Sequence, residues 1–550
     1  MGPPVVDDSE HRVEHVLHLE PVTQDQVREC VKNMRGGSAP GVDDLSAKTL
    51  KNNINYLIQP LTHIVNLSIT TSVFPAALKI AKVVPIYKSN DKANLSNYRP
   101  ISLLSVISKV LEKCVKIQLQ NFLENNSILS QRQFGFRKGK NTTDALFLIN
   151  KKVTELVNVN KKALILFIDL AKAFDSLDRK LLFTKLEHLG IRGSALEWFK
   201  SYLSDRKQVV SILSEKSNAL NVDYGVVQGS TLGPLLFLIY INNLDKVYTT
   251  GELFLFADDT AVVFEGDTWE EAYQAASNGI INLKKWFDQN ILTMNVSKTE
   301  VLPIALRAGS EPPDRLRVIL HSCGDTTSST CNCQSIQQVD HYKYLGVIID
   351  SKLRYDKHIN YLKSKLRKMV YPFSQISHIL NEKEMKNAYC AFVQSTLQYG
   401  IIAYGGTYKT ILEPLSIVQK TIIKVGFRRS RFYPTELLFR ETSILSIRQL
   451  FIKTILVFTF LNKDLVITPI PHNYLTRHAR NIGMVMPRVV KSVNCTNSFY
   501  IANFLHRNIP SEIRDSNAPV ATLKRMLSDW LINSGSEHAE ALLKSIYAAA

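Results

Sequence analysis

Two adjacent carboxylates, Asp258 and Asp259, stand in the otherwise apolar stretch LFLFADDTAVVF at positions 253–264. The apolar residues on either side predict two strands joined by a tight hairpin turn that carries the aspartates. A second apolar run, ALILFIDL, predicts another strand and contains Asp169 near its end. If the two strands are neighbours in one sheet, three carboxylates meet at one edge, where a cation relieves their mutual repulsion.

Such a cluster of carboxylates is typical of divalent-metal chemistry. Oxygen ligands without nearby Cys or His favour Mg²⁺ or Mn²⁺, and two such ions can clamp the attacking and leaving oxygens of an in-line phosphoryl transfer. Polymerases and some nucleases work in this way. Because an Asp pair alone is also common in ordinary turns, the neighbouring sequence has to decide between the two interpretations.

The elements that must position these carboxylates follow from the pattern of apolar residues. Between about residues 66 and 350, short β-rich runs alternate with amphipathic stretches, which predicts an α/β (α+β) domain. Residues 1–65 contain the turn cluster GGSAPGVDDLS between two helix-like stretches and are expected to form an N-terminal extension. Residues 351–550 have a helical and basic pattern, which predicts a third region.

The net charge is concentrated in that third region. The chain has 67 Lys and Arg against 49 Asp and Glu, a net charge of +18. Residues 1–350 hold 39 basic and 37 acidic residues, and residues 351–550 hold 28 and 12, so the two parts carry +2 and +16. This asymmetry predicts a surface for a polyanion, with nucleic acid favoured over anionic membrane. A merely soluble basic domain is the other interpretation.

Composition and cysteine usage argue against a secreted or membrane protein. The longest uncharged apolar stretch, LGPLLFLIYI, is too short to cross a bilayer, and the N-terminus lacks the features of a signal peptide. The seven cysteines are scattered, which is typical of reduced thiols and predicts an intracellular protein of the cytoplasm and nucleus. Cys323, Cys331 and Cys333 lie close together, where a loop is favoured over a zinc site.

A series of ordered blocks carries more specific information. It runs through FPAALKIAKVVPIYKSND, NYRPISLLSVISKVLEK, SQRQFGFRKGKNTTDAL, FIDLAKAFDSLDRKLLFTKLEHLGIRG, GVVQGSTLGPLLFLIYINNL, LFADDTAVV, LTMNVSKTE and YKYLGVIID. This series resembles the reverse transcriptases of non-LTR (LINE-type) retrotransposons, particularly the jockey-like group of animal elements. The resemblance extends in unbroken order from about Gly36 to Asp350. It implies a right-hand polymerase with fingers and palm, followed by a mainly helical, basic thumb and C-terminal region.

The resemblance also implies an activity and its partners. The family copies an RNA template into DNA, adding dNTPs to the 3′-hydroxyl of a DNA primer or of nicked target DNA. Asp169, Asp258 and Asp259 match its catalytic carboxylates, which hold two Mg²⁺ ions, with Mn²⁺ as an alternative. Phe174 matches the aromatic steric gate that crowds a ribose 2′-hydroxyl. An ordinary core phenylalanine on a helix is the alternative for that residue.

Five further residues are assigned through the same resemblance. Gln228 and Gly229 in VVQGS match the loop against the nascent base pair, where glycine permits close backbone approach. Lys88 and Arg99 match fingers residues near the incoming triphosphate, where cations offset phosphate charge. Lys298 in NVSKTE matches a lysine suspected of protonating pyrophosphate, with a solvated surface lysine as the alternative.

The chain departs from the family pattern at two of these blocks. Val227 stands where proline is usual, which is expected to loosen the loop before Gln228. Arg179 stands where histidine is usual, and we expect it to lie away from the metals. Asp175 and Asp178 follow Asp169 closely, but we expect them to form the turn or cap at a helix start.

Three functions are compatible with the sequence. An RNA-directed DNA polymerase is favoured, and a catalytically inactive RNA-binding remnant of a degraded element is the first alternative. A viral-type RNA-dependent RNA polymerase is the second, but such enzymes usually have glycine at the position of Ala257, and Phe174 disfavours ribonucleotides. No apurinic-type endonuclease, Cys/His knuckle or RNase H is visible, so we expect a chain that copies RNA without nicking its own target.

Overall fold

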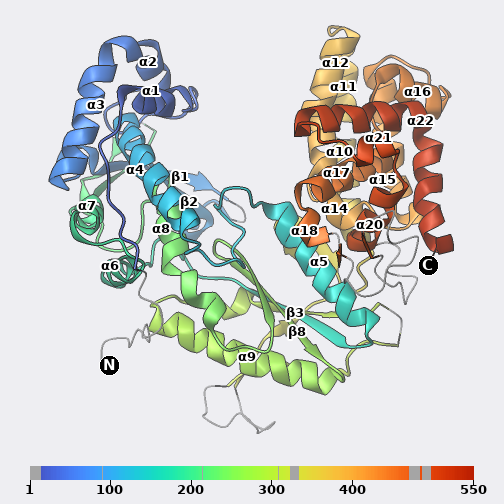
Figure 1. Cartoon of the computed structure of the whole chain (residues 1–550), viewed down its shortest axis with the longest axis horizontal. Coiled ribbons are helices and arrows are strands. Elements are labelled where there is room, and N and C mark those ends of the chain that lie inside the picture. The colour runs from blue at the N-terminus through green and yellow to red at the C-terminus, as the bar shows by residue number, and fades with distance from the viewer. Residues whose placement is uncertain are drawn as a thin grey trace.

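The computed structural model describes residues 14–88, 91–213, 215–306, 309–321, 333–466, 468–469, 484–485 and 497–549. Two lobes rise from a common base in Figure 1, one formed by N-terminal helices and a small sheet, the other by C-terminal helices. We call them the N-terminal lobe and the C-terminal lobe. The base consists of a second sheet with one long helix beneath it (Figure 1). The predicted mixture of helices and strands is confirmed.

The N-terminal lobe contains helices packed beside a five-stranded sheet. Its strand order is β2-β1-β4-β5, with β6 paired to β4, and β1 runs antiparallel to β2 but parallel to β4. The first helix begins with a capping box at Thr23, which fixes its start. The elements are α1 (Gln24–Lys32), α2 (Ala47–Asn52), α3 (Ile54–Thr71), α4 (Val106–Asn125), α6 (Arg179–His188), α7 (Gly193–Leu203), β1 (Ile80–Tyr87), β2 (Tyr98–Leu103), β4 (Lys207–Ile212), β5 (Glu215–Lys216) and β6 (Leu220–Asn221).

The sheet of the base brings distant parts of the sequence together. Its order is β12-β9-β3-β8-β7, and β3 is antiparallel to both β8 and β9. Side chains of β3 alternate between the two faces, as a strand buried on both sides requires. The elements are β3 (Lys162–Ile168), β7 (Glu252–Phe256), β8 (Asp259–Gly266), β9 (Glu300–Ile304), β12 (Gln337–Gln338), α5 (Thr142–Asn158), α8 (Gly233–Tyr240) and α9 (Trp269–Gln289).

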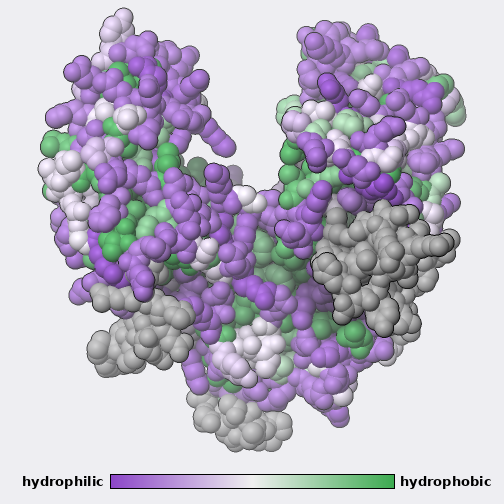
Figure 2. All heavy atoms as spheres, in the orientation of Figure 1, coloured by the Kyte–Doolittle hydropathy of each residue, from purple (hydrophilic) through white to green (hydrophobic). Residues whose placement is uncertain are grey.

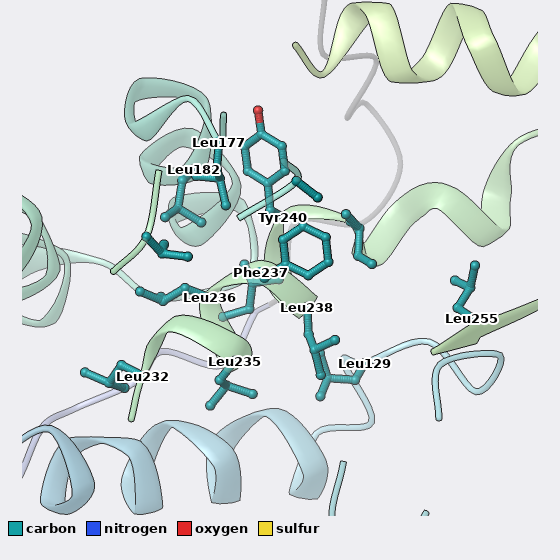
Figure 3. Packing of buried hydrophobic residues seen from close by; sticks show 14 of the residues in the cluster. Leu129, Leu177, Leu182, Leu232, Leu235, Leu236, Phe237, Leu238, Tyr240 and Leu255 are labelled. Atoms are coloured by element: carbon teal, nitrogen blue, oxygen red, sulfur yellow. The ribbon is translucent and has the colours of Figure 1, made fainter. Parts of the chain in front are cut away.

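The alternating side chains of β3 belong to two different hydrophobic cores. Leu164 and Leu166 belong to the first core, with α9 and the helices of the N-terminal lobe. Ile165 and Phe167 belong to the second, with α5 and the C-terminal helices. Figure 3 shows side chains of α8, including Phe237, in the middle of the first core.

The two cores cross the boundaries that the sequence predicts between regions of the chain. The first core contains residues from both sides of position 65, and the second contains residues from both sides of position 350. The division into 1–65, 66–350 and 351–550 therefore remains a prediction about sequence regions.

The C-terminal lobe is helical in the part of the chain that the structure describes. A hairpin of β13 (His341–Tyr344) and β14 (Val347–Asp350) leads into it. Its longest helix contains Gly535 with a φ of 82°, where two helical segments meet at a kink. The helices are α10 (Asp356–Arg367), α11 (Val370–Ile376), α12 (Glu382–Tyr389), the π turn η5 (Cys390–Gln394), α13 (Ser395–Gln398), α14 (Ile401–Tyr404), α15 (Lys409–Gly426), α16 (Thr435–Thr442), α17 (Ile447–Leu461), α18 (Lys463–Val466), α20 (Ser498–Asn508), α21 (Ser511–Arg514) and α22 (Val520–Ala549).

Two sequence predictions concern membranes and metals outside the base. Among the described residues no single helix combines the length and apolar composition that crossing a bilayer requires, although α16 and α17 reach both when counted together as a bent pair. Of the three clustered cysteines, Cys323 and Cys331 lie outside the described residues, and Cys333 is half-buried. The choice between a zinc site and a loop there stays a prediction.

Candidate active site

The Asp258–Asp259 pair lies at a tight turn, as the sequence predicts. The last residue of β7, Phe256, pairs with the first residue of β8, Asp259, which leaves Ala257 and Asp258 as a two-residue turn. Ala257 has a φ of +56°, the left-handed region that such turns require. This conformation is uncommon for a residue with a Cβ atom, so the surrounding structure has to hold it.

Asp169 lies on the neighbouring strand of the same sheet. It directly follows β3, whose last residue, Ile168, pairs with Thr260 beside the turn. The prediction that these strands are neighbours is therefore confirmed. The Oδ2 atom of Asp169 accepts a hydrogen bond from the Asn295 side chain at 3.0 Å. Lys298 Nζ lies 3.9 Å from the same oxygen.

Asn295 was missed by the sequence analysis, although it stands in the block LTMNVSKTE. Its backbone N–H also donates to the Asp169 carbonyl at 2.8 Å. Asparagine is common in turns, and only the fold brings this one to Asp169. Asn295 therefore fixes the direction in which the Asp169 carboxylate points.

The electrostatics of Asp258 and Asp259 reflect burial and repulsion between neighbouring carboxylates. Burial first, and then the charges of Asp258 and Asp169, raise the pKa of Asp259 to about 6. Burial and the charge of Asp169 likewise raise the pKa of Asp258, while Arg99 opposes this rise. Asp258 and Asp259 thus stand in an environment that disfavours their negative charge, and a bound cation would relieve this.

The residues fit a divalent cation as part of a shared site. Among the described residues no group of three or more His, Cys, Asp or Glu side chains is close enough to hold a metal ion by itself. The carboxylates are hard oxygen donors, and their mutual repulsion favours a cation between them. Mg²⁺ commonly takes one or two carboxylates and completes its shell with water and substrate phosphates, which suits an open set of ligands.

Phe174 lies in a series of turns between β3 and α6, and not on a helix. Its ring stacks on the buried ring of Phe237, with centroids 4.4 Å apart, and meets the edge of Phe136 at 6.4 Å. The side chain itself is half-buried. It therefore presents a fixed aromatic surface at the rim of the first core, which is compatible with a gate.

The loop with Gln228 and Gly229 passes close to β2. Gly229 has a φ of +112°, and a Cβ atom there would lie 2.3 Å from the Ser102 carbonyl oxygen. The Ser102 N–H donates to the Gln228 carbonyl at 2.9 Å. The close approach that glycine permits is thus to a strand of the N-terminal lobe, and contact with a base pair stays a prediction.

Asp175 and Asp178 lie at the turn and the helix cap that the sequence predicts. Asp178 caps α6 by accepting the N–H of Leu181 at 2.8 Å. Asp175 lies in the preceding turn, and its carboxylate also accepts hydrogen bonds from the Gln228 side chain. The sequence gives no signal for this contact because the two residues lie far apart in the chain.

Arg179 fastens the segment that leads into the same loop. Its guanidinium donates to the carbonyl oxygens of Val222, Tyr224 and Gly225, at 2.6, 3.1 and 3.1 Å. Arginine offers five donors in a planar fork, so it can hold several carbonyls at once. Val227, which stands in place of proline, lies two residues beyond Gly225. The expected loosening of the loop stays a prediction.

Lys88 and Arg99 lie on the hairpin of β1 and β2 in the N-terminal lobe. Arg99 pairs with Ile86 across the hairpin, and the N–H of Lys88 donates to the Asn97 carbonyl at 2.9 Å. Both side chains are exposed. Since the charge of Arg99 acts on the pKa of Asp258, the hairpin lies on the same side of the molecule as the carboxylates.

Comparison with known proteins agrees with this geometry. Residues 86–349 match the family model described as reverse transcriptase (RNA-dependent DNA polymerase), and every candidate site residue lies within that range. This chain therefore resembles the LINE-type reverse transcriptases. The resemblance stated from the sequence blocks is therefore confirmed.

Three proteins that are similar to this chain come from Drosophila melanogaster. The chain is 26% identical over 435 residues to the probable RNA-directed DNA polymerase from transposon BS, covering 76% of this chain and 46% of that protein. It is 24% identical to the probable RNA-directed DNA polymerase from transposon X-element, covering 88% and 51%, and 27% identical to the RNA-directed DNA polymerase from mobile element jockey, covering 74% and 44%. The chain thus spans about half the length of these relatives.

A solved structure of apo telomerase from Candida tropicalis, truncated from its C-terminal domain, is a more distant match. The likeness covers 51% of this chain and 55% of that chain, with 12% identity and a TM-score of 0.33.

Proposed function

We propose that this chain is an RNA-directed DNA polymerase that adds dNTPs to a primer 3′-hydroxyl on an RNA template. One observation carries the proposal: Asp169 and the Asp258–Asp259 turn meet at one edge of the central sheet, in a domain of the reverse transcriptase family. The N-terminal lobe then acts as fingers, the base as palm and the C-terminal lobe as thumb.

The carboxylates and their neighbours have distinct roles in this proposal. Asp169, Asp258 and Asp259 would supply carboxylate ligands to two divalent ions that they share with substrate phosphates, and these ions would stabilise charge on the attacking and leaving oxygens. Asn295 orients the Asp169 carboxylate through its 3.0 Å hydrogen bond. Lys298, which is largely exposed beside Asp169, is free to approach and protonate a leaving pyrophosphate.

The nucleotide pocket lies between the carboxylates and the Gln228 loop. Phe174 acts as the gate because its ring, braced by Phe237, cannot retreat from a 2′-hydroxyl. Gln228 and Gly229 form the wall against the nascent base pair. Arg99 and Lys88, both exposed on the β1–β2 hairpin, supply positive charge for the triphosphate.

The template and primer are proposed to lie in the notch between the lobes. Figure 2 shows a deep hollow there, and α10 to α12 border it in Figure 1. On and after α10, the basic side chains of Lys365, Arg367 and Lys368 are exposed, and so is the ring of Tyr371 just beyond. Basic residues interleaved with exposed aromatic rings are typical of surfaces that follow a nucleic-acid backbone.

A primer-extension assay with the full chain tests the proposal. A labelled DNA primer on an RNA template is incubated with Mg²⁺ and either dNTPs or rNTPs. The proposed function requires extension with dNTPs. Extension with rNTPs alone indicates an RNA-dependent RNA polymerase, and hybrid binding without any extension indicates an inactive RNA-binding remnant.

The Asp258→Asn variant tests the site within the same assay. It removes one negative charge from the proposed metal site, so extension should fall by orders of magnitude while hybrid binding survives. Asp267→Asn, just beyond the far end of β8, is the matched control and should extend normally. Near-normal extension by Asp258→Asn would refute the assignment of that carboxylate.

A further inference from the structure

A short segment before α5 runs along the free edge of the central sheet. Gln133 pairs with Leu255 of β7 in a parallel bridge. The N–H of Phe134 donates to the Leu255 carbonyl at 2.8 Å, and the N–H of Leu255 donates to the Arg132 carbonyl at 3.0 Å. The segment therefore follows β7 up to the turn that carries the aspartate pair.

The Gln133 side chain reaches directly into that turn. Its Oε1 atom accepts the N–H of Ala257 at 2.9 Å and the N–H of Gly135 at 2.8 Å. Gln133 is 3% exposed, Ala257 is 4% exposed and Gly135 is buried, so water cannot easily replace the Gln133 oxygen at either N–H. Without this oxygen, two buried backbone donors would be left unpaired, which is costly.

The contact also depends on a glycine two residues further along. A Cβ atom on Gly135 would lie 2.5 Å from the Ala257 backbone nitrogen. Only glycine lets the segment come this close to the turn. The Nε2 atom of Gln133 is buried without a partner among the described residues, a cost that an apolar side chain would avoid. The Gln133 side chain therefore acts at the turn through its oxygen atom and not through its nitrogen atom.

From these contacts we infer that Gln133 is a positioning residue that holds the Ala257–Asp258 turn for catalysis. Ala257 occupies the left-handed region at a φ of +56°, where a residue with a Cβ atom is strained. The Gln133 oxygen fixes its N–H and so fixes the direction of the next two side chains, Asp258 and Asp259. The inference rests on the proposed function, because it assigns these carboxylates to the reaction.

Gln133→Leu in the full chain tests this inference, because leucine keeps the volume and removes the acceptor. Gln131→Leu is the matched control, since Gln131 is exposed two residues away. Hydrogen exchange of peptides covering residues 253–262 should become faster in Gln133→Leu and stay unchanged in the control. The extension rate at saturating dNTP should fall by about tenfold or more, the effect of losing one or two buried hydrogen bonds, with hybrid binding unchanged.

A second substitution separates positioning from simple loss of structure. Glycine adopts the left-handed region without strain, so Ala257→Gly in the Gln133→Leu background should recover part of the lost extension rate. Unchanged exchange at 253–262, an unchanged extension rate, or equal losses of extension and hybrid binding in Gln133→Leu would each overturn the inference. If the wild-type chain extends no primer, the proposed function fails and the positioning role fails with it, while the exchange result still decides whether the contact exists.

Discussion

The side-chain amide of Gln228 donates to both carboxylate oxygens of Asp175, with Nε2 2.7 Å from each. This contact joins the loop of the proposed nucleotide pocket to the turns that carry Phe174. Burial raises the pKa of Asp175, and the hydrogen bond from Gln228 opposes that rise. A carboxylate that is half-buried and bonded to one amide therefore fixes the orientation of that amide.

Asp175→Ala should disturb the pocket and leave the metal site in place. Gln228 loses a charge-assisted hydrogen bond, so we expect the KM for dNTP to rise by about tenfold with a smaller change in kcat. Steady-state extension with varied dNTP measures both. Asp178→Ala is the control: it removes the cap of α6 and should cost about 1 kcal/mol of stability without raising KM. Equal KM values in the two variants would contradict a role of Asp175 in the pocket.

Phe174→Val should weaken discrimination against ribonucleotides. The smaller side chain leaves room for a 2′-hydroxyl, and a packed site that excludes by steric clash loses much of its selectivity when the clash is removed. We expect the ratio of rNTP to dNTP incorporation to rise by about tenfold or more. Phe183→Val changes another partly buried phenylalanine packed on the same core and should leave the ratio unchanged. An unchanged ratio in Phe174→Val would make this residue an ordinary packing residue.

Much of the sheet edge that carries the three aspartates was predictable from local patterns. Apolar runs predict the strand before Asp169 and the hairpin around Asp258, and the structure contains both. The pairing of β3 with β8 joins segments that lie far apart in the sequence, so local patterns do not predict it. The family resemblance supplied that step.

The contacts that hold the site in place were not predictable. Asn295, Gln133 and Asp175 are ordinary polar residues in their local sequence, and each meets its partner only through the fold. At Gly229 the structure shows a close approach to Ser102, which the sequence did not indicate, while the approach to a base pair stays a prediction. Hydrogen bonds between segments far apart in the chain leave no periodic signal.

The sequence also does not show which core each amphipathic helix packs against. The periodicity of α5 indicates which of its faces is apolar but not that this face joins the core of the C-terminal lobe. Because residues on both sides of position 350 share this core, removal of residues 351–550 would disrupt the core as well as remove the basic charge. Substitutions of exposed charges are the better experiment.

Lys365→Gln with Lys368→Gln should weaken binding of an RNA–DNA hybrid and flatten its salt dependence. Each phosphate contact releases condensed counterions, so the slope of log affinity against log salt should become shallower by up to about 0.9 per lost contact, or nearly two units for the pair. Hybrid binding across a salt series measures the slope.

The control for this pair removes the same charge elsewhere. Lys285→Gln with Lys544→Gln changes two exposed residues. They belong to α9, which lies beneath the base, and to the last part of α22, which lies on the outer side of the C-terminal lobe (Figure 1). The control should keep the wild-type slope. Equal slopes in all three proteins would mean that this part of α10 does not contact the hybrid.

His358 should make the fold sensitive to acid. It is 1% exposed, its Nδ1 atom accepts the N–H of Ile348 at 3.3 Å, and its Nε2 atom is buried without a partner among the described residues. Burial first, and then the nearby charge of Lys343, lower the pKa of His358 from 6.5 to about 4. The folded chain therefore keeps this imidazole neutral at pH values where the unfolded chain protonates it.

The direction of the pH effect follows from this difference in proton uptake. Above pH 6.5 both states are neutral and the stability is complete; as the pH falls from 6.5 towards 4, only the unfolded state gains a proton and the fold loses stability, by on the order of 3 kcal/mol in total. Thermal unfolding between pH 7 and pH 4 measures the loss. His358→Gln removes the titrating group, so its Tm should fall less over this range than that of the wild type. His378→Gln, at an exposed position, should follow the wild-type curve. A wild-type Tm that falls in parallel with that of His358→Gln would show that other groups cause the acid sensitivity.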